Sequence, residues 1–183
     1  VYRLWIDLAK EDEGKAITLE FDGVMWDSHI YVNGKHAFFN HFGYKSFSVD
    51  ISEFANYGEP TLITVAASVY EDCSRWYPGA GIYRHVWLIK TPSLHLDDWS
   101  TNIEALSDDI KVSSRIQNEE TGSKKATLTV EFYDAEGNMV SSNSTKTTLK
   151  GGVQQDVALN LRINNAKRWS PDSPYLYTAV IKV

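Results

Sequence analysis

Alternation of apolar and polar residues is the dominant pattern along the first half of this chain. Apolar side chains recur at every second position, which is the period of a β-strand with one face on a core. The segments with this pattern are residues 2–8, 17–21, 30–32, 44–51 and 61–69. The pair Asn33-Gly34 follows the third segment and predicts a tight hairpin, because both residues tolerate positive φ. Residues 52–55 could form one helical turn at most.

The second half has the same period with more even spacing. Alternating segments occupy residues 94–96, 103–105, 110–116, 126–132 and 157–163. The sequence Asp134-Ala135-Glu136-Gly137 predicts a hairpin turn that ends in a glycine bulge. Short strands at regular intervals are typical of a small immunoglobulin-like sandwich. Of the 23 aromatic residues, 17 precede Leu94, and this change in composition favours a domain boundary close to it.

One run, from Ile82 to Ile89, is apolar or aromatic at nearly every position. A continuous apolar run predicts a strand that is covered on both faces. The preceding Pro78-Gly79-Ala80-Gly81 cannot pair in a sheet, so we expect a sharp bend there. The loop before that bend is therefore anchored to a central strand, which is how a rigid scaffold usually presents binding groups.

That loop carries the candidate binding residues of the chain: Asp72, Arg75, Trp76 and Tyr77. Aromatic faces stack on the C–H faces of sugars, while a guanidinium and a carboxylate bind their hydroxyls. The combination predicts a carbohydrate site. Two plainer interpretations stay open: the aromatic pair could cap a core, and the acidic turn at Asp72 could simply be solvated.

Charge and cysteine content exclude other classes of function. The net charge of −6 is spread along the chain and gives no electrostatic footprint for nucleic acid. Cys73 is the only cysteine, so disulfides within the chain and thiolate metal sites are not expected. No apolar run has the length of a membrane span. We predict no cofactor.

The histidines do not predict a metal site. They occupy positions 29, 36, 41, 85 and 95, in spacings that match no standard ligand pattern. On alternating strands several of them would face opposite ways. A nucleophile-elbow motif is also absent from the sequence.

The run Arg75-Trp76-Tyr77-x-Gly79-x-Gly81-Ile82-Tyr83-Arg84-x-Val86-Trp87-Leu88 resembles a known signature. It is similar to the segment that closes the sugar-binding domain of family-two glycoside hydrolases, and its spelling is nearest the β-galactosidase-like members. Upstream segments support the resemblance, because they follow one another in the order found in the family: residues 21–24, 31–35, 43–44 with Phe47, and 50–51. Residues 169–177 resemble the close of the family's second domain.

The resemblance implies an all-β chain of two β-sandwiches. Residues 1–92 would form a jelly-roll sugar-binding domain whose opening strand is missing, and residues 93–183 an immunoglobulin-like domain. In the family a catalytic barrel follows, and it carries both catalytic glutamates. We therefore assign no catalytic residue here and expect an excised fragment.

Two functions from different classes follow. The first is the non-catalytic accessory portion of a retaining β-glycosidase, which shapes one wall of the active site. Its partners would be a β-galactoside-like carbohydrate and the C-terminal catalytic barrel of the same chain. The second is a free-standing carbohydrate-binding or adhesion module. The sequence leaves the oligomeric state and the compartment open, and a periplasmic or extracellular parent enzyme is our working assumption.

We expect different roles for the two arginines of this run. Arg75 would lean towards the active-site mouth, hydrogen-bonding a sugar hydroxyl or orienting a barrel carboxylate, with Trp76 beside it. For Arg84 we predict a structural ion pair with a carboxylate inside the sandwich. The alternative for Arg84 is a surface arginine on a strand.

Overall fold

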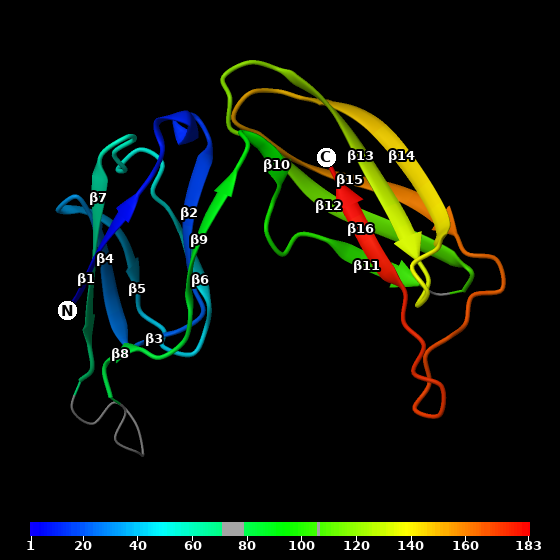
Figure 1. The fold of residues 1–183 in the computed structure, drawn as a ribbon, viewed down its shortest axis with the longest axis horizontal. Coiled ribbons are helices and arrows are strands. Elements are labelled where there is room, and N and C mark those ends of the chain that lie inside the picture. The colour runs from blue at the N-terminus through cyan, green and yellow to red at the C-terminus, as the bar shows by residue number, and fades with distance from the viewer. Residues whose placement is uncertain (71–78, 106) are drawn as a thin grey trace. The chain divides into compact units, whose positions relative to one another are not determined.

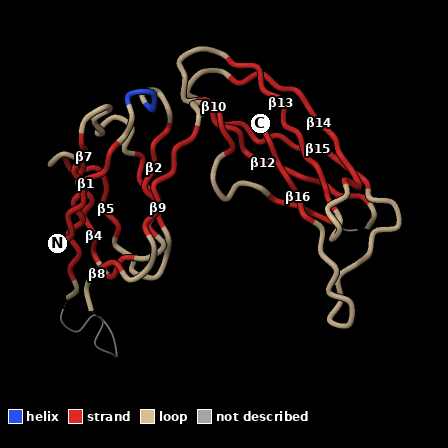
Figure 2. The backbone as a smooth tube through the Cα atoms, viewed as in Figure 1, coloured by secondary structure: helices blue, strands red, loops and turns tan. Residues whose placement is uncertain are grey.

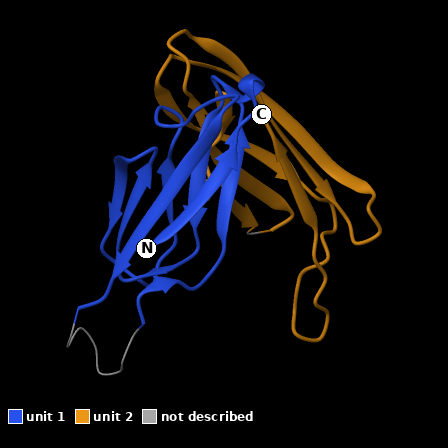
Figure 3. Cartoon of the chain, turned by 60° about the vertical axis from the view of Figure 1, so that its left-hand side comes forward, with its two compact units in different colours: residues 1–92 blue, residues 93–183 orange. Residues whose placement is uncertain are grey.

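The structure is a computed structural model that describes residues 1–70, 79–105 and 107–183. The chain divides into two compact units, Val1–Pro92 and Ser93–Val183 (Figure 3). Strands account for nearly all of the regular structure, as Figures 1 and 2 show, and they confirm the all-β prediction of two sandwiches. Within the described residues, no helix is long and apolar enough to cross a membrane.

Unit 1 is built from two antiparallel sheets and one short strand pair. The larger sheet has the order β1-β7-β4-β5, and the smaller has the order β6-β2-β9. The larger sheet consists of β1 (Tyr2–Asp7), β7 (Pro60–Ser68), β4 (Asp27–Val32) and β5 (Lys35–Asn40). The smaller consists of β6 (Phe47–Asp50), β2 (Ala16–Phe21) and β9 (Val86–Thr91), while β3 (Val24–Met25) pairs with β8 (Gly81–Ile82). A single 3-10 turn, η1 (Lys10–Asp12), precedes β2.

The turn between β4 and β5 confirms the predicted hairpin. Asn33 and Gly34 have φ angles of 50° and 79°, the left-handed pair that a two-residue turn requires. The Asn33 side chain also accepts a hydrogen bond from the Leu62 amide and donates one to the Phe54 carbonyl. These bonds attach the turn to β7 and to the loop between β6 and β7.

The core of unit 1 lies between its two sheets. Phe21 is 1% exposed, and its ring stacks on Phe47 at a centroid distance of 4.9 Å. Phe38 stacks on the same Phe47 ring at 5.6 Å. The aromatic stack thus joins β2, β6 and β5 across the sandwich. Aliphatic side chains fill the remaining core: Leu8, Ile17, Leu19, Val24, Ile30, Val32, Val49, Ile51, Ile63 and Val65.

The prediction of one buried strand from Ile82 to Ile89 is wrong. The run is broken into β8, which ends at Ile82, and β9, which begins at Val86. Among the described strands β9 pairs with β2 alone and so forms the edge of its sheet, where Val86, Trp87 and Leu88 are 41%, 52% and 38% exposed. Apolar content alone could not reveal this, because burial on both faces depends on neighbouring elements.

β1 differs from its prediction in the same way. Tyr2 and Leu4 belong to the apolar side of the alternation, yet both are exposed, because β1 is also an edge strand. An apolar groove of about 250 Å³ lies between these two edges, and Tyr2, Leu4 and Val86 are among its lining residues.

A buried carboxylate holds β9 to the start of unit 1. Asp12 is 4% exposed and accepts hydrogen bonds from Lys15 Nζ at 2.7 Å and Lys90 Nζ at 2.5 Å. The Ala9 amide donates a third bond at 3.2 Å. The bonds from Lys15 and Lys90 lower the pKa of Asp12 from 3.8 to about 2.

This shift predicts acid sensitivity. A pKa that is lower in the folded state contributes stability above pH 3.8, and the contribution is lost as the pH falls towards 2. Asp12→Asn should therefore be less stable than the parent at pH 6, and the two should converge near pH 2. Urea titrations of both proteins across this range test the expectation. A difference that stays constant with pH would contradict it.

Unit 2 is a second sandwich with its own core. In one sheet β12 (Asp109–Asn118) pairs with β10 (Leu94–Leu96), β11 (Asn102–Ala105) and β15 (Val153–Arg162). The other has the order β14 (Met139–Leu149), β13 (Lys124–Tyr133) and β16 (Thr178–Lys182). The predicted turn before β14 is confirmed: Gly137 has a φ of 84°, and the register shifts between Phe132 and Tyr133. Val112, Ile116, Leu128, Val130 and Leu149 are fully buried.

Candidate functional site

The four sequence-predicted site residues, Asp72, Arg75, Trp76 and Tyr77, lie outside the described residues. The segments that flank them are described, and both attach to the same end of unit 1 (Figure 1). On one side the Tyr70 hydroxyl donates to the Asp27 carboxylate, at the first residue of β4. On the other side Gly81 pairs with Met25 of β3, so the prediction that Gly81 cannot pair in a sheet is wrong.

Asp27 is the most unusual ionisable group at this end. It is 4% exposed, its Oδ2 accepts the Tyr70 hydroxyl at 2.5 Å, and its Oδ1 contacts His41 Nδ1. Burial alone would raise its pKa, but the bonds from Tyr70 and His41, with the nearby charges of His41 and His29, lower it overall. The hydrogen bond between Tyr70 and Asp27 also raises the pKa of the Tyr70 hydroxyl. Asp27 is therefore a carboxylate that is held ionised and already engaged by two partners.

The short segment after β5 carries two exposed aromatic rings, Phe42 and Tyr44. Phe42 and Tyr44 meet edge to face at 5.9 Å, and the Tyr44 ring meets Trp26 in the same manner at 6.3 Å. Phe42 and Tyr44 are 51% and 49% exposed, respectively. Two exposed aromatic rings, one of which carries a hydroxyl, suit the stacking of a sugar or of another protein surface.

Tyr83 fixes this segment in place. Its hydroxyl donates to the Gly43 carbonyl at 2.7 Å, linking the residues after β8 to those after β5. Its ring lies so close to Gly23 that a Cβ there would sit 2.6 Å from the ring. Position 23 therefore requires glycine, because the Tyr83 ring leaves no room for a side chain. Tyr83, which belongs to the signature, has a structural role.

The prediction that Arg84 pairs inside the sandwich is wrong for the part of the chain that the structure describes. Arg84 is exposed, and it takes part in none of the ion pairs among the described residues. It follows β8 in the break before β9, and its exposure excludes burial between the sheets. The exposure of Arg84 agrees with the alternative prediction of a surface arginine, although Arg84 lies between two strands and not on one.

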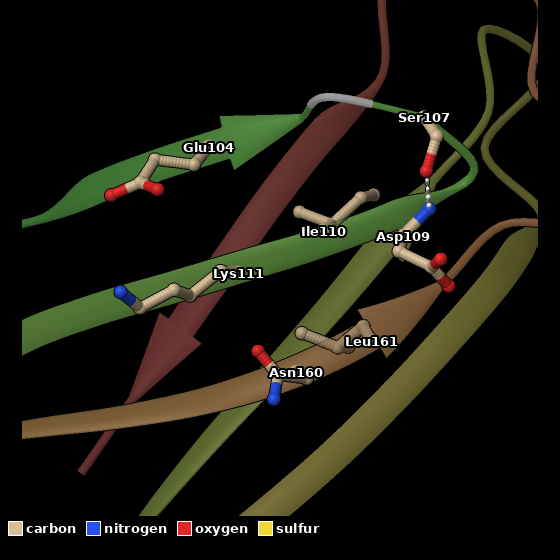
Figure 4. A pocket seen from close by; sticks show the side chains of 7 residues that line it. All are labelled: Glu104, Ser107, Asp109, Ile110, Lys111, Asn160 and Leu161. Atoms are coloured by element: carbon tan, nitrogen blue, oxygen red, sulfur yellow. Dashed lines mark hydrogen bonds between the residues drawn. The ribbon is translucent and has the colours of Figure 1, made fainter.

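A second hollow, of about 500 Å³, lies on unit 2 (Figure 4). Its polar lining groups include Glu104, Lys111 and Asn160, and the Ser107 hydroxyl receives the Asp109 amide at 3.1 Å. The lining contains no aromatic ring. This hollow therefore lacks the stacking groups that sugar recognition favours.

Sequence reasoning missed Asp27, His41 and Tyr70 because they are distant in the chain and match no motif. Only the aromatic density around Phe42-Gly43-Tyr44 could have drawn attention to this end.

Two family models match the chain, each over one unit. The model described as "Glycosyl hydrolases family 2, sugar binding domain" matches residues 1–92, and the model "Glycosyl hydrolases family 2" matches residues 94–183. Both matches follow the boundary between the units.

Individual relatives agree with these matches. Beta-galactosidase BoGH2A of Bacteroides ovatus is 34% identical over an alignment of 188 positions, which covers 100% of this chain and 22% of that protein. A beta-glucuronidase of Formosa agariphila is 29% identical and aligns with 98% of this chain and 21% of its own length. The crystal structure of a glycosyl hydrolase family 2 member from Bacteroides cellulosilyticus has a TM-score of 0.91 at 30% identity, covering 98% of this chain and 25% of that one. The chain thus spans about a fifth to a quarter of the relatives it matches.

Proposed function

The chain belongs to glycosyl hydrolase family 2, and from this premise we propose that it is the non-catalytic accessory portion of a retaining β-glycosidase. In this proposal residues 1–92 form the sugar-binding domain and residues 93–183 the immunoglobulin-like domain. The observation that carries it is the match of two family models, in tandem order, over the two compact units.

The proposed role is to shape one wall of an active site that a barrel of the same parent chain completes. The loop with Arg75 and Trp76 would face the substrate, a β-galactoside-like carbohydrate. This proposal is supported by hydrogen bonds in the described segments on either side of the loop: Tyr70 donates to Asp27, and Tyr83 donates to Gly43.

Asp27 is unsuited to serve as a catalytic acid in this proposal. Retaining glycosidases use two carboxyl groups about 5–5.5 Å apart, one of which must hold a proton at neutral pH. The lowered pKa of Asp27 keeps it ionised, and its two oxygens are occupied by Tyr70 and His41. Asp27 therefore acts as an anchor for the flank of the loop.

We expect the 183-residue chain alone to leave aryl β-galactosides intact, because the catalytic carboxyl pair belongs to the barrel. Hydrolysis by the purified chain and by the full-length enzyme, measured side by side with a chromogenic substrate, tests this. Turnover above background that disappears when one of the chain's own acids is replaced would contradict the proposal.

Binding of free galactose to the same chain separates the two function classes. A partial site should hold a monosaccharide at about millimolar strength at best, or roughly −4 kcal/mol. Titration calorimetry that gives a dissociation constant in the low micromolar range would instead favour a free-standing carbohydrate-binding module.

A further inference from the structure

A β-bulge in the β4–β5 hairpin brings two histidines together on the outer face of unit 1. His29 pairs with Phe39, and Ile30 with Phe38, but the next pair is Tyr31 with His36, so Ala37 is an extra residue. In a regular ladder His36 would lie opposite Val32, whose side chain points into the core. The extra residue turns His36 to the exposed side, beside His29. Bulges re-aim side chains in this way and are frequent next to functional sites.

The two imidazole rings contact each other through one ring nitrogen from each. His29 Nδ1 and His36 Nε2 are 3.1 Å apart, so one ring donates a hydrogen bond to the other. A transition-metal ion binds imidazole nitrogen at about 2.0–2.1 Å, and two such bonds at an angle of about 90–110° span roughly 2.8–3.4 Å. The observed separation falls within that span. Chelation requires that the donating ring move its proton to its other nitrogen and that both rings turn, so that the lone pair on each facing atom is directed at the ion.

Neighbouring rings hold the pair in position. Phe39 stacks on His29 at a centroid distance of 4.5 Å, and Tyr31 meets the His36 ring edge to face at 5.1 Å. Side chains held by packing lose little rotamer freedom when they coordinate an ion. His36 is exposed and His29 is half-buried, so an ion from solvent can reach both.

We propose that His29 and His36 form a chelating site for a divalent transition-metal ion of the Ni²⁺, Cu²⁺ or Zn²⁺ class. These ions favour imidazole donors, with Cu²⁺ binding most tightly. Within the described residues there is no group of three or more His, Cys, Asp and Glu side chains with metal-binding geometry, so water completes the coordination. The site is independent of the proposed glycosidase role.

Titration calorimetry of the tag-free 183-residue chain with NiCl₂ and with CuCl₂ at pH 7.5 tests the proposal. One ion per chain is expected, bound more tightly for Cu²⁺ than for Ni²⁺. Losing an outer-sphere partner of a metal site typically weakens binding about 10- to 100-fold, so His29→Gln and His36→Gln should each weaken it at least ~10-fold. Circular dichroism of each variant checks that it is folded.

A matched variant keeps the pair and removes the other histidines: His41→Gln, His85→Gln and His95→Gln combined. This variant should bind Cu²⁺ as the parent does, and its electron paramagnetic resonance spectrum should show two imidazole nitrogens. Loss of binding in this variant would overturn the proposal. Unchanged affinity in folded His29→Gln or His36→Gln, or no heat of binding in the parent at millimolar ion, would overturn it equally.

Discussion

Replacing Arg75 with alanine in the full-length enzyme is expected to lower kcat/KM by about tenfold to a thousandfold. In the proposed function Arg75 donates a charged hydrogen bond to a sugar hydroxyl or orients a barrel carboxylate. Losing a hydrogen bond to a charged group costs about 1.5–3 kcal/mol or slightly more, and each 1.36 kcal/mol is a factor of ten. Steady-state kinetics with an aryl β-galactoside measure the loss.

Arg84→Ala is the matched control for this variant. Arg84 has the same side chain, follows the same loop, is exposed, and takes part in none of the ion pairs among the described residues. Its replacement should leave both kcat/KM and Tm close to the parent's. The Tm of Arg75→Ala should also be nearly unchanged. If Arg75→Ala unfolds early while its activity per folded molecule is normal, Arg75 supports the scaffold and the proposed contact with the active site is wrong.

Local chemistry explains which parts of the fold could be predicted. The Asn33-Gly34 turn and the Gly137 turn depend on backbone angles that few residues adopt, so the sequence determines both hairpins. The period-two segments likewise become strands, since no competing helical pattern exists. The failure at Val86–Leu88 has a different origin: an apolar strand is buried only if other elements cover it, and β9 stands at a sheet edge.

The candidate site could be predicted only in part, for a related reason. The loop with Arg75 stays a prediction, because its contiguous residues match a family signature but lie outside the described residues. Asp27, His41 and Tyr70 come from three separate segments, and their convergence follows from strand pairing that no short pattern encodes. The His29–His36 pair depends on one extra residue in β5, and a regular ladder would have placed His36 on the opposite face.

Phe21→Ala is expected to lower the free energy of unfolding of unit 1 by about 3–5 kcal/mol. Phe21 is 1% exposed and stacks on Phe47, so truncation removes apolar burial and leaves a cavity that the stacked rings cannot close. A loss of this size is a large fraction of the ~5–15 kcal/mol that stabilises a typical domain. Urea unfolding, followed by tryptophan fluorescence and circular dichroism, gives the change in free energy.

Two control variants show whether the loss belongs to this core. Phe39→Ala removes the same side chain from an exposed position, where Phe39 is 44% exposed, and should cost far less than Phe21→Ala. Leu128→Ala creates a cavity in the separate core of unit 2 and should destabilise that unit by about 2–5 kcal/mol. Because the two cores share no residue, Phe21→Ala and Leu128→Ala should each lower a different unfolding transition. Equal losses for Phe21→Ala and Phe39→Ala would mean that the aromatic stack at Phe47 contributes little and that the core of unit 1 lies elsewhere.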